Sequence, residues 1–113
     1  MHEYSLIRSL LDRVAAAARQ HGAVRVERLR VRVGELAGVD RELLASAFEL
    51  ARAGTCCDGA ELEVVAAPAR WECSQCKTEL PQGGVLRCGS CGAPARLAGG
   101  DEIILERLEM EVP

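Results

Sequence analysis

The chain has 113 residues and a mass of 12.1 kDa, which fits one domain, or one small domain with a module too small to fold without help. Half of it is apolar, which argues against wholesale disorder, and its net charge of −3 argues against binding nucleic acid or a membrane surface mainly through charge. No apolar run reaches the roughly 18–20 residues of a membrane span, and the first residues have no secretion-signal pattern. We therefore expect a cytoplasmic protein whose six cysteines stay reduced, as metal ligands or buried thiols.

The inventory of catalytic side chains is small. The sequence has two histidines, one lysine and three aromatic residues. It contains neither a phosphate-binding Gly-x-x-x-x-Gly-Lys-Ser/Thr loop nor a Gly-x-Ser-x-Gly nucleophile motif. We therefore expect a protein that is not an enzyme.

Two segments have the period of amphipathic helices. Residues 4–20 carry apolar side chains at spacings of three and four, and Gly22 follows at the position of a C-terminal cap. Residues 41–53 repeat the pattern, with Asp40 as the N-cap and Gly54 as the stop. The predicted buried stripes are Ile7, Leu10, Leu11, Val14 and Ala18 in the first helix, and Leu43, Leu44, Ala47, Phe48 and Ala51 in the second.

Three segments alternate as strands do, at 23–33, 60–67 and about 102–110. In the first, the apolar phase slips by one residue, which predicts a bulge near Glu27–Arg28. Pro68 ends the second strand. In the third, Ile104, Leu108 and Met110 are predicted to share the inward face.

The element order predicts an α+β fold: two helices packed on a small three-stranded sheet, with an inserted four-cysteine zinc-ribbon module. Because the third strand follows the cysteine-rich segment, the main domain is discontinuous. We expect it to comprise residues 1–68 plus 98–113, with residues 69–97 as the cysteine module.

The strongest motif is Cys-x2-Cys-x11-Cys-x2-Cys, formed by Cys73, Cys76, Cys88 and Cys91. Two such pairs, each in a tight turn, complete a tetrahedron of thiolates around one ion, with zinc first and rubredoxin-type iron as the alternative. With all four positions filled by thiolate, no position remains for water or substrate, so we expect a structural zinc. The other two cysteines, Cys56 and Cys57, are adjacent; we expect them at the rim of the core as small apolar groups.

The first three residues bring several nitrogen and oxygen donors together. The α-amine of Met1, the backbone nitrogen of His2 and its imidazole can close fused chelate rings on one ion, and Glu3 offers a backbone nitrogen or a carboxylate as a fourth donor. Nitrogen-rich, square-planar sets of this kind suit Ni(II) or Cu(II). The second histidine, His21, lies at the end of the first helix, and we interpret it as structural.

These features together resemble one known family. Met-His-Glu-Tyr-Ser at the start, the early amphipathic helix, the Val-Arg-Val-Gly-Glu-Leu-Ala-Gly-Val segment (31–39) and the two Cys-x-x-Cys pairs are similar to the HypA/HybF nickel metallochaperones of [NiFe]-hydrogenase maturation. The resemblance covers essentially the whole chain. It implies nickel as transferred cargo, with His2 as the essential ligand assisted by Met1 and Glu3, and a structural zinc at the four cysteines.

The resemblance also implies partners. Members of this family deliver nickel to the hydrogenase large subunit together with a HypB-type GTPase, and some also supply urease through its accessory proteins. The discontinuous domain is then the nickel-binding domain. Nothing in the resemblance gives Cys56 and Cys57 a role.

Two alternatives remain open. One is a zinc ribbon that binds nucleic acid or protein, favoured by the cysteine module and by Arg25, Arg28, Arg30 and Arg32 on the first strand, and opposed by the net charge and the few aromatic side chains. The other is a redox protein that uses Cys-x-x-Cys, opposed by the Gly- and Pro-rich loops around both pairs.

Overall fold

The computed structural model describes residues 2–113, so Met1 lies outside the described residues. Over this range the chain forms two helices and five strands, in the order α1 (His2–His21), β1 (Arg25–Gly34), α2 (Arg41–Ala51), β2 (Glu61–Ala67), β3 (Arg70–Cys73), β4 (Ala95–Gly99) and β5 (Ile103–Glu111).

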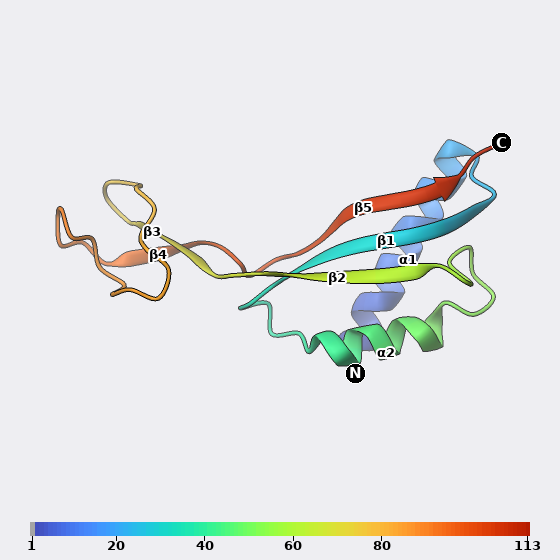
Figure 1. The fold of residues 1–113 in the computed structure, drawn as a ribbon, viewed down its shortest axis with the longest axis horizontal. Helices are drawn as coiled ribbons and strands as arrows, with labels where there is room; N and C mark the ends of the chain where they lie inside the picture. Colours follow the sequence, from blue (N-terminus) through green and yellow to red (C-terminus); the bar gives the residue numbers. More distant parts are fainter. Residues whose placement is uncertain (1) are drawn as a thin grey trace.

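The strands form two separate sheets. The larger has the order β2-β1-β5, with β1 parallel to β2 and antiparallel to β5. The smaller is the antiparallel pair β3-β4, inserted between β2 and β5 in the chain. We call α1, α2 and the larger sheet the α/β body, and β3, β4 and the loops between them the four-cysteine module. The module extends from one end of the body (Figure 1), and the molecule measures 55 × 29 × 16 Å. The predicted fold class is confirmed.

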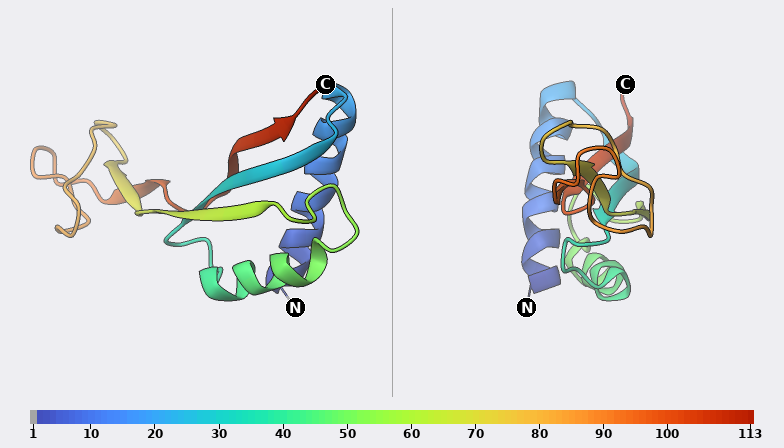
Figure 2. Two further views of the ribbon diagram at one scale, coloured as in Figure 1. Left: turned by 45° about the vertical axis from the view of Figure 1, so that its right-hand side comes forward. Right: turned by 90° about the vertical axis from the view of Figure 1, so that its left-hand side faces the viewer.

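The core lies between the two helices and one face of the larger sheet (Figure 2). The central strand β1 buries every side chain on that face, because it has a neighbouring strand on each side and helices above it. The opposite face of β1 carries its arginines. The buried side chains of the sheet are Val26, Leu29, Val31 and Val33, which pack with Ile7, Leu10, Leu11, Val14, Leu44, Ala47 and Phe48 of the helices.

Both predicted helices are confirmed, with different lengths. α1 starts two residues earlier than the pattern indicated, at His2, and all five side chains of its predicted stripe are buried. α2 ends two residues earlier, at Ala51. Asp40 is its N-cap, since its carboxylate accepts hydrogen bonds from the backbone N–H groups of Glu42 and Leu43. The predicted buried stripe of α2 is wrong at one residue. Leu43 is 45% exposed, because it lies at the edge of the apolar face.

The predicted bulge in β1 is confirmed, and a second one corrects the prediction for β5. The pairing of β1 with β5 shifts between Val26 and Arg28, and shifts again between Arg30 and Val31. The second shift places an extra residue in β5 near Glu106, which reverses the alternation of the preceding residues. Ile104 is therefore exposed, in contrast to the prediction, and Ile103 and Leu105 pack on the core in its place.

None of the helices formed by residues 2–113 is long and apolar enough to cross a membrane.

Candidate metal sites

The two Cys-x-x-Cys pairs fold into turns with matching hydrogen bonds. In the first, the N–H of Lys77 donates to the carbonyl of Cys73 over 3.0 Å, and the N–H of Cys73 donates to the carbonyl of Thr78 over 2.9 Å. In the second, the N–H of Gly92 donates to the carbonyl of Cys88 over 2.9 Å. The N–H of Cys88 completes the match by donating to the carbonyl of Ala93, also over 2.9 Å. The two turns are therefore structural copies of one another.

The residue after each pair has a left-handed backbone. The φ angle is 65° at Lys77 and 74° at Gly92. Glycine takes this conformation without steric cost, whereas lysine does not. The second turn therefore carries at Gly92 the residue type that this backbone favours, whereas the first turn carries a lysine at the equivalent position.

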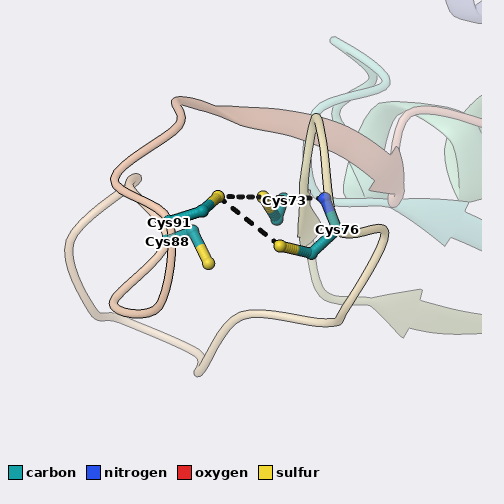
Figure 3. Close-up of side chains that lie close together, drawn as sticks. All are labelled: Cys73, Cys76, Cys88 and Cys91. Carbon is teal, nitrogen blue, oxygen red and sulfur yellow. Dashed lines mark hydrogen bonds between the residues drawn. The ribbon is translucent and has the colours of Figure 1, made fainter.

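The two turns bring all four thiols to one point (Figure 3), where the sulfur atoms lie within 4.8 Å of one another. The Sγ of Cys91 lies 3.4 Å from that of Cys73 and 3.5 Å from that of Cys76. A tetrahedral Zn²⁺ with Zn–S bonds of about 2.3 Å separates its sulfurs by about 3.8 Å. The donor set and its spacing thus fit zinc, and the cluster indicates a structural zinc site. Bound there, zinc would cross-link both turns, which otherwise rest on few apolar contacts.

The thiols differ in acidity because their surroundings differ. Two backbone N–H groups, of Cys76 first and then of Gln75, point at the Sγ of Cys73 over 3.2 and 3.4 Å. They lower the pKa of Cys73 to about 6. The hydrogen bond with the Cys91 thiol, then that with Cys73, and burial raise the pKa of Cys76 to about 12. The backbone N–H groups of Cys91 and Ser90 lower the pKa of Cys88. Cys76 therefore holds its proton more tightly than Cys73 and Cys88 do.

The start of α1 presents one exposed and one buried candidate ligand. The side chain of His2 is 61% exposed, and its Nδ1 lies 3.9 Å from the Oε2 of Glu3. Glu3 is buried, and the same Oε2 accepts a hydrogen bond from the backbone N–H of Asp40 over 3.2 Å. The third candidate, Met1, lies outside the described residues. The imidazole is thus open to solvent, while the carboxylate beside it is held against the N-terminus of α2.

Cys56 and Cys57 lie far along the chain from the four-cysteine motif, in the loop between α2 and β2. Cys57 is fully buried in the core and Cys56 is partly buried. Burial first, and then the neighbouring Cys56 thiol, raise the pKa of Cys57 to about 12. The expectation of small apolar groups at the rim of the core holds for Cys56, whereas Cys57 lies inside the core.

The arginines of β1 are paired with carboxylates of both neighbouring strands. Arg28 contacts Glu61 over 3.1 Å, and Arg30 contacts Glu63 over 2.9 Å. Arg32 pairs with Glu106 of β5 and Arg25 with Glu111. The Glu63 and Glu106 carboxylates raise the pKa of Arg30. This face is a charge-balanced ladder rather than a basic patch, which weakens the nucleic-acid alternative.

The redox alternative is weakened by the local fold. A redox Cys-x-x-Cys pair owes its reactivity to a position at a helix N-terminus, whereas both pairs here lie in turns that follow or precede short strands.

The fold and the cysteine geometry define a small α+β protein with an inserted four-cysteine metal-binding module. Residues 1–110 match the family model described as "Hydrogenase/urease nickel incorporation, metallochaperone, hypA". The chain is 36% identical over 112 residues to hydrogenase maturation factor HypA of Nitrosospira multiformis, covering 97% of each chain. It is 43% identical over 107 residues to hydrogenase maturation factor HypA of Deinococcus radiodurans, covering 93% of this chain and 89% of that one.

Solved structures agree with these sequence relatives. The solution structure of the Ni metallochaperone HypA from Helicobacter pylori matches with a TM-score of 0.77 at 30% identity, over 98% of each chain. A second solution structure, of a HypA protein, matches with a TM-score of 0.85 at 31% identity, over 100% of this chain and 98% of that one. The chain belongs to the HypA family of nickel-incorporation metallochaperones for hydrogenase and urease.

Proposed function

We propose that this protein binds Ni(II) at its N-terminus and delivers it, in the cytoplasm, to the large subunit of a [NiFe]-hydrogenase. The exposed imidazole of His2 at the very start of α1 is the observation that carries this proposal. A HypB-type GTPase would act with it, and urease accessory proteins are a second class of recipient, since the family description names both enzymes. The protein acts by binding and transfer rather than by catalysis.

The nickel ligands in this proposal are the amine of Met1, the backbone nitrogen and imidazole of His2, and a donor from Glu3. The first backbone N–H groups of a helix have no partner within the helix, so a metal can take them without breaking the hydrogen bonds of α1. Because the Glu3 carboxylate already accepts the N–H of Asp40, we assign the fourth position to the Glu3 backbone nitrogen. This planar set suits Ni(II).

Release follows from the position of the site. His2 is open to solvent, so an incoming ligand of a partner can replace the imidazole without unfolding the core. The zinc ligands Cys73, Cys76, Cys88 and Cys91, by contrast, would hold their ion permanently. Accordingly, we propose residues 1–68 plus 98–113 as the nickel-binding domain and residues 69–97 as the zinc-binding domain.

Native mass spectrometry of the untagged, zinc-loaded protein with added nickel tests the proposal. His2→Ala is compared with His21→Ala, which removes the other histidine from the opposite, exposed end of the same helix. We expect one zinc in every sample, and tight nickel binding by the wild type and by His21→Ala alone. Equal nickel uptake by His2→Ala and wild type would exclude the N-terminal site.

Transfer itself needs a recipient. Nickel-loaded wild type is mixed with a nickel-free hydrogenase large subunit, and the metal content of each is measured after separation. We expect nickel to move to the large subunit from the wild type. Retention of nickel by the wild type in the presence of the HypB-type GTPase and nucleotide would contradict the delivery role.

A further inference from the structure

The α/β body and the four-cysteine module are joined by a narrow neck rather than by packing. Two chain segments cross it, one from β2 to β3 through Pro68 and Ala69, and one from β4 to β5 through Gly100. Neither helix packs broadly against β3 or β4, and Figure 1 and the left view of Figure 2 show the module standing clear of both helices. The neck alone must therefore determine how the module is oriented.

Backbone packing at the neck is unusually close. A Cβ atom on Gly34, at the end of β1, would overlap the carbonyl of Gly100, and a Cβ on Gly100 would lie 2.5 Å from the Cα of Ala69. The backbone N–H of Gly34 donates to the backbone carbonyl of Glu102 over 2.8 Å, and the backbone N–H of Leu36 donates to the carbonyl of Gly100 over 2.7 Å. The end of β1 is thus bonded to the segment that leads from β4 to β5.

Ala69 is held from both sides. Its backbone N–H donates to the Oε1 of Glu35, in the body, over 3.2 Å. Its carbonyl accepts a hydrogen bond from the Nε2 of Gln82, in the loop between the two cysteine pairs, over 3.0 Å. The backbone N–H of Glu35 also donates to the carbonyl of Ala67 over 2.8 Å. Ala69 is buried, so water competes little for these bonds.

We propose that Glu35 and Gln82 are positioning residues that fix the four-cysteine module on the α/β body by clamping Ala69. Glu35 supplies the clamp from the body and Gln82 supplies it from the module, so a rotation of the module about the neck breaks at least one of the two hydrogen bonds. The clamp gives any protein that docks on both parts a single rigid surface. This inference goes beyond the proposed function and does not depend on nickel binding.

Backbone residual dipolar couplings of the zinc-loaded, full-length protein test the clamp. In the wild type, we expect the amides of the body and of the module to fit one common alignment tensor. In the double variant Glu35→Ala/Gln82→Ala, the module should require its own, smaller tensor. Two tensors in the wild type, or one unchanged tensor in the double variant, would overturn the proposal.

Matched variants separate the clamp from general damage. Glu35→Gln keeps an oxygen that accepts from Ala69, so it should retain the common tensor. Val85→Ala lies in the same loop as Gln82 with a side chain that is 79% exposed, and it should also behave as the wild type. Loss of zinc from the double variant would contradict the proposal, because the two residues are proposed to orient the module and not to build it.

Amide hydrogen exchange at Ala69 gives a local readout that does not depend on whether the double variant folds. In the wild type, we expect slow exchange at this N–H. Glu35→Ala should accelerate it by about tenfold, since the lost bond has a charged acceptor, whereas Glu35→Gln should not. Fast exchange at Ala69 in the wild type would show that the bond to Glu35 does not hold the neck.

Discussion

The carboxylate of Glu3 accepts a hydrogen bond from the backbone N–H of Asp40, a residue 37 positions further along the chain. Asp40 in turn caps α2 through its own side chain. The proposed nickel-binding end of α1 is therefore attached to the first turn of α2. A sequence pattern does not reveal this link, because each residue on its own is typical of a helix start.

Replacing Glu3 by alanine should loosen this attachment. A part-buried N–H would lose a charged acceptor, so we expect the free energy of unfolding of the zinc-loaded protein to fall by about 1–2 kcal/mol. Glu3→Gln retains an acceptor and should cost less. Urea denaturation of the wild type and both variants measures the difference. Equal stability of Glu3→Ala and wild type would mean that the bond to Asp40 contributes nothing to the docking of α1 on α2.

The sequence was most informative where apolar residues follow a strict period. The buried stripe of α1, the cap at Asp40 and the bulge near Glu27 could all be predicted, because each leaves a mark in the residue pattern of a single segment. The grouping of the four cysteines into one metal site could also be predicted, since such a site needs particular donor types at a fixed spacing.

What the sequence could not show depends on contacts between distant segments. The second bulge, near Glu106, arises in the pairing of β5 with β1, and it reversed the predicted orientation of Ile104. The short strands β3 and β4 were not predicted, because their few residues alternate too briefly to give a signal. The clamp on Ala69 joins Glu35 to Gln82, two residues that no local pattern connects.

Zinc affinity should depend on pH with a definite sign. The pKa of Cys76 is raised to about 12, so this thiol carries its proton at neutral pH and must release it when zinc binds. Cys73, with a pKa of about 6, is already mostly ionised at pH 7. The apparent affinity should rise at least about tenfold per pH unit between pH 7 and 8.

Competition between the metal-free protein and a chromophoric chelator, at pH 7.0 and 8.0, measures this slope. Each reading is corrected for the protonation of the chelator. A zinc affinity that does not change between pH 7.0 and 8.0 would show that no thiol of the cluster holds a proton at neutral pH.

Removal of zinc should affect only one part of the molecule. Excess chelator at low pH should remove the metal and unfold the four-cysteine module while leaving the α/β body intact.

The two glycines of the second cysteine turn should respond differently to substitution. Gly92 has a φ of 74°, so Gly92→Ala forces an L-residue into the left-handed region and should destabilise the zinc-loaded module by about 1 kcal/mol. Gly89→Ala is the matched control, because nothing lies within 4 Å of its added Cβ and its φ is not positive. Lys77→Gly should relieve strain at the equivalent position of the first turn.

Chelator competition on the three variants tests this assignment. We expect zinc to be lost most readily from Gly92→Ala and least readily from Lys77→Gly, with Gly89→Ala close to the wild type. If Gly89→Ala lost zinc as readily as Gly92→Ala, the loss of a glycine in general, and not the left-handed backbone, would be what weakens the turn.

The ion pairs of Glu106 on the outer face of the sheet should make stability depend on pH. Hydrogen bonding and charge from Arg32, and then from Arg30, lower the pKa of Glu106 below its ordinary value of 4.5. A carboxyl group whose pKa is lowered by folding stabilises the native state above its unfolded pKa, and this contribution is lost as the pH falls through the folded value. Glu106→Gln should therefore melt at a lower temperature than the wild type at pH 7, by a small margin, since the pair faces solvent.

Thermal unfolding at several pH values and salt concentrations measures that margin. The difference between Glu106→Gln and the wild type should shrink as the pH falls below about 4 and as salt approaches about 1 M, because protonation removes the charge and ions screen it. Glu27→Gln changes an exposed carboxylate of β1 that forms no ion pair with an arginine among residues 2–113, so it should show no such dependence. If the difference in melting temperature between Glu106→Gln and the wild type stayed the same at low pH, Glu106 would act through packing of its side chain beside the bulge in β5. The ion pairs across the three strands would then contribute little to the stability of the sheet.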